Sequence, residues 1–247
     1  MERHQLLIAH RGWSTRFPEN SVPSIAAALS AGADEVEIDL RVSRDGGVFL
    51  LHDETLDRVT DLEGPIGSFA SSELEHCTVR NLDGTGLVGL GLPTFRQVHD
   101  VFGGLITFNI HVKEAPGIDI ALAEIRDCLG VKNTKDHYVA SDAKTLRAAR
   151  TLMPGVGRCL VSDRTEAIGP LLDTATSLGC ERVQFFVGNC APADVAAAKA
   201  RGLVTNYYFA DSVAEAGELQ HWGIDAVLTN DIGPLAVARR DQAVEPT

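Results

Sequence analysis

Residues 6–12 read Leu-Leu-Ile-Ala-His-Arg-Gly, a short apolar run that stops at two basic residues and a glycine. Such a run is typical of a buried strand. A doubly wound dinucleotide-binding fold would have Gly-x-Gly-x-x-Gly directly after this strand, and the sequence has His-Arg-Gly instead. A segment with helical spacing follows at residues 21–30, between Asn20 and Gly32 as start and stop signals, and a second apolar run at residues 36–40 completes a strand–helix–strand unit.

The same alternation continues along the chain. Further apolar or β-branched runs predict strands at residues 48–51, 105–112, 138–140, 157–161, 182–186, 203–208 and 226–228. Helical spacing predicts helices at residues 118–128, 143–153, 166–177, 193–200 and 213–221. Strands alternating with helices over about 250 residues are typical of an eightfold barrel. We therefore expect one α/β domain over residues 1–247, a TIM (β/α)8 barrel, with a doubly wound open sheet as the alternative.

One interval interrupts the alternation. Residues 53–92 are rich in Asp, Gly, Ser and Thr, and only a short patch at residues 71–75 has helical character. This composition predicts a small insertion after the second strand region rather than a further barrel unit. Loops at the carboxyl ends of barrel strands commonly cover the active site, so we expect the insertion to lie beside it.

Composition and charge exclude several classes of protein. The 247 residues are 45% hydrophobic, enough to bury a large core. Acidic residues outnumber basic ones by 34 to 22, and the net charge of -12 disfavours binding to nucleic acid. The five cysteines form no Cys-x-x-Cys pair, which favours a reducing cytoplasm over a disulfide framework. No stretch has the roughly 20 apolar residues of a membrane span, so we expect no integral membrane contact.

Two of the apolar runs end in a histidine. The first run is followed by His10 and Arg11, and the run at residues 48–51 is followed by His52. The active site of a β/α barrel is built at the carboxyl ends of its strands, so two imidazoles at one rim would suit acid and base work near neutral pH. The alternative is that each is an ordinary hydrogen-bonded histidine at a strand end.

Acidic side chains share one face of the second predicted strand. In this strand Glu35, Glu37 and Asp39 alternate with apolar residues, so the acids face the barrel axis while the apolar side chains face the helices. Buried carboxylates need a cation or a proton, and closely spaced carboxylates are preferred ligands of hard cations. The alternative is a salt bridge to an Arg or Lys that points inward.

A third strand is also polar on one face. This face carries Thr107, Asn109, His111 and Lys113. His111 would complete a metal site with Glu37 and Asp39, while Lys113 and Arg11 would attract an anion. Carboxylates, imidazoles and cations in one place suit metal-assisted attack on a phosphate ester. The expected partner is a small-molecule phosphodiester.

Several short motifs carry a family resemblance. They are His10-Arg11-Gly12, Pro18-Glu19-Asn20, Gly32-Ala33-Asp34, Glu37-Ile38-Asp39, Asp45-Gly46 and the segment from His52 to Thr60. In order and spacing the chain resembles the glycerophosphodiester phosphodiesterase family. The resemblance implies a β/α barrel with a small insertion and a metal-dependent hydrolysis of glycerophosphodiesters to an alcohol and glycerol 3-phosphate. It implies the following roles: His10 and His52 as general acid and base, Glu37 and Asp39 as ligands of the divalent cation, and Arg11 and Lys113 as contacts of the phosphate.

The chain departs from the family pattern at three places. The first is His111, where the family usually has a glutamate that ligates the metal. The resemblance implies Mg²⁺ or Ca²⁺, whereas an imidazole ligand favours Mn²⁺, Co²⁺ or Zn²⁺; alternatively, a change of register would bring in Glu114. The second is Tyr207-Tyr208 in place of a substrate-contacting Trp, from which we expect Tyr207 to contact the substrate. The third is Thr229-Asn230-Asp231, where the family usually reads Thr-Asp-x-Pro.

Two other functions stay open. One is a phosphodiesterase that acts on a lysophospholipid or a sugar phosphodiester, which would need a differently shaped rim. The other is a catalytically attenuated barrel that binds a phosphoester. This alternative is suggested by His111, which stands where the family usually has a glutamate. The sequence leaves open the native alcohol group, the physiological ion, the division of acid and base roles, and the oligomeric state, a homo-oligomer included.

Overall fold

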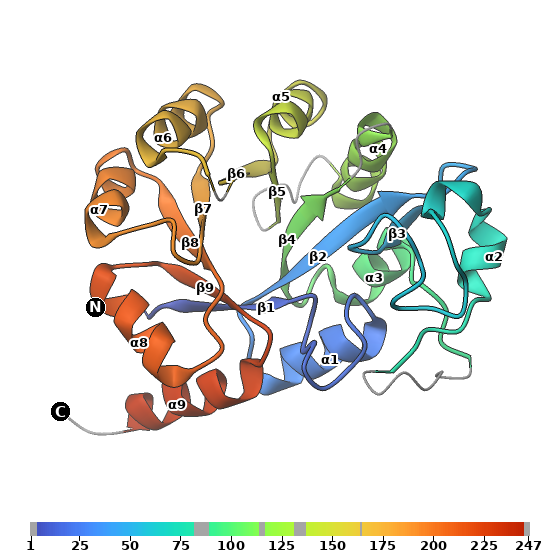
Figure 1. Cartoon of the computed structure of the whole chain (residues 1–247), viewed down its shortest axis with the longest axis horizontal. Helices are drawn as coiled ribbons and strands as arrows, with labels where there is room; N and C mark the ends of the chain where they lie inside the picture. Colours follow the sequence, from blue (N-terminus) through green and yellow to red (C-terminus); the bar gives the residue numbers. More distant parts are fainter. Residues whose placement is uncertain (1–3, 82–88, 114–116, 131–136, 164, 245–247) are drawn as a thin grey trace.

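A ring of parallel strands forms the centre of the molecule (Figure 1). The computed structural model describes residues 4–81, 89–113, 117–130, 137–163 and 165–244. Within these residues, the ring strands are β1 (Leu6–His10), β2 (Glu35–Val42), β4 (Thr107–Val112), β5 (Tyr138–Ser141), β6 (Gly157–Val161), β7 (Arg182–Phe186), β8 (Val204–Tyr208) and β9 (Ala226–Thr229). The ring closes because β1 pairs in parallel with both β9 and β2. This closure confirms the predicted TIM barrel.

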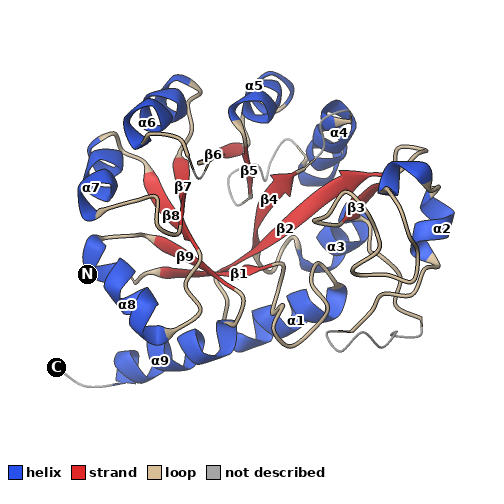
Figure 2. Cartoon of the chain, viewed as in Figure 1, coloured by secondary structure: helices blue, strands red, loops and turns tan. Residues whose placement is uncertain are grey.

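Helices surround the ring (Figure 2). They are α1 (Val22–Ala31), α3 (Phe95–Phe102), α4 (Ile118–Leu129), α5 (Ala143–Leu152), α6 (Ile168–Ser177), α7 (Pro192–Ala200), α8 (Val213–Trp222) and α9 (Ile232–Val244). The sequence analysis missed α3 and α9. A signal for α3 was present, because Thr94 and Gln97 cap each other's backbone N–H groups at its start. In α9 the Gly233-Pro234 pair is typical of a turn, although the first turn of a helix tolerates proline. Within the described residues, no helix is long and apolar enough to cross a membrane.

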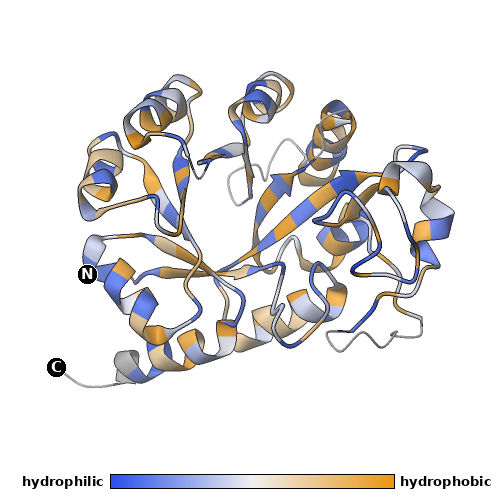
Figure 3. Ribbon diagram, in the orientation of Figure 1, coloured by the Kyte–Doolittle hydropathy of each residue, from blue (hydrophilic) through white to orange (hydrophobic). Residues whose placement is uncertain are grey.

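The alternating pattern of β2 separates the core from the barrel interior. Val36, Ile38 and Leu40 are fully buried and belong to the large apolar cluster between the strands and the helices. The intervening acidic residues point inward, so hydrophilic and hydrophobic colours alternate along β2 (Figure 3). Full burial of each such aliphatic side chain contributes about 1.5–3 kcal/mol to the stability. The apolar half of the strand therefore fixes the barrel wall, and the polar half is held inside it.

One predicted strand lies outside the ring. The strand β3 (Val48–Leu50) pairs antiparallel with β2 beyond the barrel mouth. The expectation that His52 follows a barrel strand was therefore wrong in topology, because residues 43–47 form a tight turn with Gly46 at φ 90° that sends the chain back along β2. The returning chain is tied to the barrel by a hydrogen bond of 3.0 Å, which the backbone N–H of Leu51 donates to the carbonyl oxygen of Asp39. The antiparallel return brings His52 back to the barrel mouth.

The inserted segment has an apolar cluster of its own. It is formed by Phe49, Leu51, Leu56, Ile66, Leu74, Cys77, Val79 and Leu92. A short 3-10 helix (Ile66–Ser68) and α2 (Ser71–Glu75) contribute to it, and α2 coincides with the predicted helical patch. In Figure 1 this segment lies at one side of the molecule, next to β2 and β3. Its small core keeps the chain after β3 beside the barrel mouth.

Candidate active site

A pocket of about 280 Å³ opens at the carboxyl ends of the ring strands. Its polar side is formed by His10, Arg11, Glu37, His52, His111 and Lys113. Its other side is formed by Val161, Gln184, Phe186, Tyr208 and Leu228, which come from or follow β6 to β9. The structure thus brings six of the predicted site residues together, and the wall opposite them is mainly apolar.

Glu37, Asp39 and His111 could hold a metal ion. Parallel pairing of β2 with β4 sets Asp39 beside His111. The Nδ1 atom of His111 lies 3.8 Å from Glu37 Oε1 and 3.7 Å from Asp39 Oδ1, and a ligand atom from each residue lies within 4.8 Å of the others. Asp39 Oδ1 is buried, and its nearest cationic neighbour is Lys113 Nζ at 3.1 Å. The distances from His111 to the carboxylates are too long for direct hydrogen bonds and suit three ligands around a cation.

Positive groups surround Asp39 beneath the pocket. Arg11 Nε and Lys113 Nζ each lie 3.1 Å from a carboxylate oxygen of Asp39, and Asn20 Nδ2 donates a 2.9 Å hydrogen bond to it. Burial by itself would raise the pKa of Asp39, but Lys113, Arg11 and His111 outweigh it and hold the pKa well below its usual range. Asp39 is therefore ionised throughout the neutral range and is available as an anionic ligand.

The turn after β1 explains the His-Arg-Gly sequence. Arg11 has φ 58°, and its backbone N–H donates to Glu37 O at 2.9 Å. Gly12 has φ 80°, and a Cβ atom there would lie 2.4 Å from Ser24 Oγ. A side chain at Gly12 would therefore clash with α1. The turn directs the guanidinium of Arg11 toward Asp39 and Glu19, to which Arg11 Nη1 donates at 2.9 Å.

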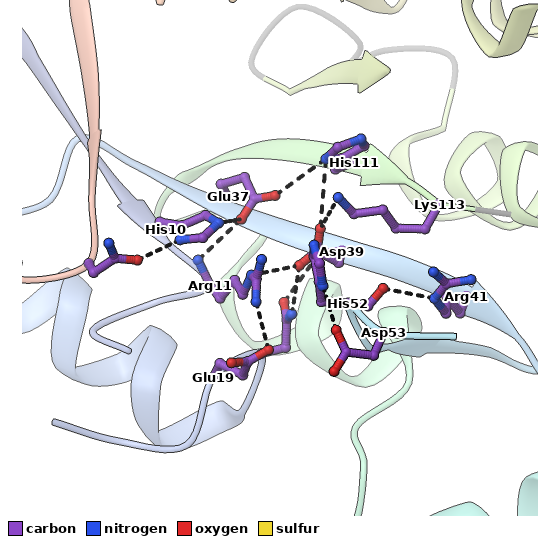
Figure 4. A network of polar contacts seen from close by, with 12 residues as sticks. His10, Arg11, Glu19, Glu37, Asp39, Arg41, His52, Asp53, His111 and Lys113 are labelled. Atoms are coloured by element: carbon purple, nitrogen blue, oxygen red, sulfur yellow. Dashed lines mark hydrogen bonds and ion pairs between the residues drawn. The ribbon is translucent and has the colours of Figure 1, made fainter. Parts of the chain in front are cut away.

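His52 is oriented by a chain of charged groups that the sequence analysis did not assign, and Figure 4 shows its first member, Asp53, beside the ring. Its Nδ1 atom lies 2.7 Å from Asp53 Oδ1, and Arg58 donates both to Asp53 and to Glu19. The hydrogen bond from Arg58 lowers the pKa of Asp53 to about 2. Burial lowers the pKa of His52 itself. The carboxylates of Asp39 and Asp53 raise this pKa, but by less than burial lowers it. The neutral imidazole of His52 is thus favoured at neutral pH.

His10 is oriented by a different kind of group. Its side chain is largely buried, and Nδ1 lies 2.7 Å from Oδ1 of Asn230. The other ring nitrogen, Nε2, lies 3.8 Å from Glu37 Oε2 on the pocket side, and the ring packs edge-on against Tyr208. His10 and His52 therefore both reach the pocket, and each is held through Nδ1 by a residue outside the metal-ligand set.

Comparison with known proteins identifies the family. The model of the glycerophosphoryl diester phosphodiesterase family matches residues 10–234. The chain belongs to this family. It is 25% identical over 249 residues to a glycerophosphodiester phosphodiesterase of Bacillus subtilis strain 168, covering 91% of this chain and 83% of that protein. It is 34% identical over 119 residues to one from Caldanaerobacter subterraneus subsp. tengcongensis, covering 46% of this chain and 49% of that protein, so this match spans about half of the relative.

A solved structure shows the same fold. A phosphodiesterase of Oleispira antarctica, in complex with the product sn-glycerol-3-phosphate, superposes with a TM-score of 0.84 at 23% identity, covering 96% of each chain. The closed barrel is therefore the fold of that solved phosphodiesterase, and the family to which the chain belongs is one of phosphoric diester hydrolases.

Three further residues of this phosphodiesterase family member were singled out from the sequence. Tyr207 lies on the outer face of β8, where its ring packs against Trp222, and Tyr208 is the tyrosine that lines the pocket. Glu35 lies at the opposite end of the barrel, where Arg182 Nη2 donates to it at 2.9 Å. The inward salt bridge that was the alternative for the acidic face is thus present at Glu35. Glu114 lies outside the described residues.

Proposed function

We propose that the protein hydrolyses glycerophosphodiesters to an alcohol and glycerol 3-phosphate with the help of one divalent cation. The observation that carries this proposal is the convergence of Glu37, Asp39 and His111 within 4.8 Å of one another at a pocket that also contains two imidazoles. Membership of the family supports it, as does the glycerol 3-phosphate in the Oleispira antarctica structure. The family match and the geometry of the pocket point to the same chemistry.

We assign the cation to Glu37, Asp39 and His111. A bound divalent ion neutralises charge on the phosphoryl oxygens of the substrate. Arg11 and Lys113 lie at the same pocket and would hold the rest of the phosphate charge, which grows in the transition state. The side chains of Arg11 and Lys113 are both paired with Asp39, so their positions are fixed before the substrate binds. Such preorganisation spares the reaction the free-energy cost of reorienting them.

His10 and His52 are assigned the proton transfers. One imidazole would remove a proton from the nucleophile, which is water or the neighbouring glycerol hydroxyl, and the other would protonate the departing alcohol. Both rings line the pocket, and each is held at Nδ1, so Nε2 is the nitrogen available to the substrate. General acid and base catalysis of this kind typically contributes about 10²- to 10⁴-fold in rate.

The ion itself is expected to differ from the family's hard cations. Glu37 and Asp39 supply two negative charges, and the imidazole of His111 adds none when neutral. A ligand set with one nitrogen and two carboxylates suits Mn²⁺, Co²⁺ or Zn²⁺ better than Mg²⁺ or Ca²⁺, which prefer oxygen. We therefore propose an ion of the first group as the one bound most tightly.

A second candidate substrate is favoured by the apolar wall of the pocket. Val161, Phe186, Tyr208 and Leu228 line the same pocket as Glu37 and His111. Gln184 is the amide on this side and could bond a hydroxyl of a glycerol or sugar group, whereas the apolar side chains around it would cover an acyl chain or aromatic group. A lysophospholipid is therefore the alternative substrate class.

Release of alcohol or glycerol 3-phosphate from a panel of phosphodiesters tests both proposals. The panel would contain glycerophosphodiesters with small alcohol groups, a lysophospholipid and a sugar phosphodiester, each assayed with chelator and with Mg²⁺, Mn²⁺, Co²⁺ or Zn²⁺ added back. We expect turnover that is lost with chelator and restored by an ion. Binding of the phosphodiesters without turnover under any ion would instead support the attenuated, phosphoester-binding barrel.

A further inference from the structure

Two side chains behind His10 form a hydrogen-bonded relay. Asp211, in the loop after β8, accepts hydrogen bonds from the backbone N–H of Asn230 at 2.7 Å and from Asn230 Nδ2 at 2.8 Å. Thr229 Oγ1 donates to the same carboxylate at 3.1 Å. Asn230 Oδ1 then faces His10 Nδ1 at 2.7 Å. The relay thus runs from a carboxylate, through an amide, to an imidazole that lines the pocket.

The chemistry of the groups fixes the orientation of the Asn230 amide. An ionised carboxylate only accepts hydrogen bonds, so the amide must direct its NH₂ group toward Asp211. The amide oxygen, which also only accepts, is thereby directed toward His10. A nitrogen at 2.7 Å from such an oxygen must carry a proton. The relay therefore places a proton on Nδ1 of His10, whether the imidazole is neutral or charged.

We infer that Asp211 and Asn230 are positioning residues that keep the proton of neutral His10 on Nδ1, so that His10 exchanges protons with the substrate only through Nε2. Nε2 lies on the pocket side, 3.8 Å from Glu37 Oε2. The other tautomer would present an N–H at Nε2 and would leave the neutral ring without a basic lone pair at the pocket. This inference rests on the proposed function only in giving His10 a proton-transfer role.

The arrangement also accounts for a departure of this chain from the family pattern. An aspartate at position 230, as in the usual Thr-Asp-x-Pro, would accept from His10 with either oxygen. The amide of Asn230 has one oxygen and one NH₂ group, so it needs a second residue to choose between two orientations. Asp211 makes that choice, because it binds both the backbone and the side chain of Asn230.

The isosteric variant Asp211→Asn tests the relay. The backbone N–H of Asn230 and the hydroxyl of Thr229 both donate to Oδ1 of Asp211, so the new amide must keep its oxygen there. Its NH₂ group then faces the NH₂ group of Asn230, which has to flip and present an N–H to His10. We expect His10 to change to the Nε2–H tautomer and kcat to fall by about 10²- to 10⁴-fold, with little change in KM.

The exchange variant Asp211→Asn with Asn230→Asp is the matched control. In it the amide at position 211 donates to a carboxylate at position 230, and the other oxygen of that carboxylate accepts from His10. Every hydrogen bond of the relay is kept. Only the bond between side chains 211 and 230 has its donor and acceptor exchanged, and His10 Nδ1 still donates to an oxygen at position 230. We expect the exchange variant to recover the Nδ1–H tautomer and to have a kcat at least about tenfold higher than that of Asp211→Asn. A purely structural role of Asp211 would give no such rescue.

The tautomer is read from imidazole ¹⁵N chemical shifts of the whole protein with Mg²⁺ present, and His10 is assigned by comparison with His10→Gln. An Nε2–H signal in the wild type would overturn the inference. So would an Asp211→Asn variant that keeps the Nδ1–H signal, whatever happens to its kcat. Because the spectrum does not depend on turnover, absence of phosphodiesterase activity with the expected spectra would count against the proposed function and leave the relay in place.

Discussion

Acidic residues of β2 take part in two polar clusters, one near each end of the barrel, and the clusters differ in whether they border the pocket. The lower cluster consists of Glu35, Tyr138, Arg182 and Asn206. Glu35 accepts from the Tyr138 hydroxyl at 2.6 Å and from Arg182 at 2.9 Å, and the Arg182 guanidinium lies 4.3 Å from the centre of the Tyr138 ring. Its contacts are direct.

The upper cluster consists of Glu37, Asp39, His111 and Lys113. In it, Lys113 Nζ lies 3.1 Å from Asp39, but the imidazole of His111 stays 3.7–3.8 Å from the two carboxylates. Glu37, His111 and Lys113 line an open pocket. Burial raises the pKa of Glu35 in the lower cluster, whereas cations hold the pKa of Asp39 in the upper cluster far below its usual range. An acidic residue on the same face of β2 thus serves the fold where its partners enclose it. It serves chemistry where a pocket, and the gap between His111 and the carboxylates, leave room for an ion and an anion.

The largest effect is expected at the histidines beside the upper cluster. His10→Ala and His52→Ala should each lower turnover by about 10²- to 10⁴-fold, because each removes one proton-transfer group. Both variants should stay folded in a thermal melt, with the lower midpoint in His10→Ala, because the His10 ring is buried against Tyr208 and bonded to Asn230. The measurement is the rate of glycerol 3-phosphate release beside a thermal melt.

The exposed histidine of the insertion provides the control. His76 lies on the surface at the end of α2, and His76→Ala should keep wild-type turnover. Near-full activity of both His10→Ala and His52→Ala would remove the catalytic assignment and make the upper cluster a binding site.

The next effect is expected in the lower cluster and concerns stability. Arg182→Met should lower the free energy of unfolding by about 3 kcal/mol, because it leaves the buried carboxyl of Glu35 without its cation. Turnover of the folded variant should stay near the wild-type value. Chemical denaturation and steady-state kinetics measure the two quantities.

The pH dependence of this variant follows from the pKa of Glu35. Burial raises that pKa and Arg182 opposes the rise, so the pKa should be higher still in Arg182→Met. A carboxyl whose folded pKa exceeds its unfolded value binds more protons when folded, and stability is lost as the pH rises through the folded pKa. The destabilisation should therefore grow as the pH rises above the pKa of a glutamate in the unfolded chain, about 4.3.

A surface pair supplies the comparison. Arg201→Met removes a partly exposed pair with Asp173 and should cost less than about 1 kcal/mol, independent of pH in this range. An equal cost for Arg201→Met and Arg182→Met would show that the lower cluster owes nothing to its burial.

A smaller effect is expected for the choice of ion in the upper cluster. His111→Glu replaces the nitrogen ligand by an oxygen ligand and adds a negative charge, so it should raise the affinity for Mg²⁺ relative to Zn²⁺ by about 10- to 100-fold. Calorimetric titration of the purified protein with each ion measures this ratio. An unchanged ratio would remove His111 from the ligand set and leave the two carboxylates as the protein's ligands.

Much of this was predictable from the sequence because it depends on local patterns. The alternation of Glu35, Glu37 and Asp39 with apolar residues specifies which side chains point inward, and the apolar runs specify the ring strands. The position of β3 was not predictable in this way, because a three-residue run reads as a strand whether it joins the ring or pairs beside it.

The groups that orient the histidines depend on contacts between distant segments. Asn230 is 220 residues from His10, and Arg58 is 39 residues from Glu19. The sequence contains these residues in recognisable motifs, but only the folded barrel brings the two members of each pair together. Likewise, the sequence placed two tyrosines at the end of one strand without showing which of them faces the pocket.

The smallest effect concerns those two tyrosines. Tyr207 packs against Trp222 outside the ring, and its hydroxyl accepts a hydrogen bond from the exposed Gly188 N–H at 3.2 Å. Tyr207→Phe should therefore cost about 1 kcal/mol of stability at most and leave KM unchanged. Tyr208→Ala removes part of the pocket wall and should raise KM by about tenfold, equivalent to ~1.4 kcal/mol. The reverse result would be a raised KM in Tyr207→Phe and an unchanged KM in Tyr208→Ala. It would support the expectation from the sequence that Tyr207 contacts the substrate, and it would mean that the outer face of β8 takes part in binding.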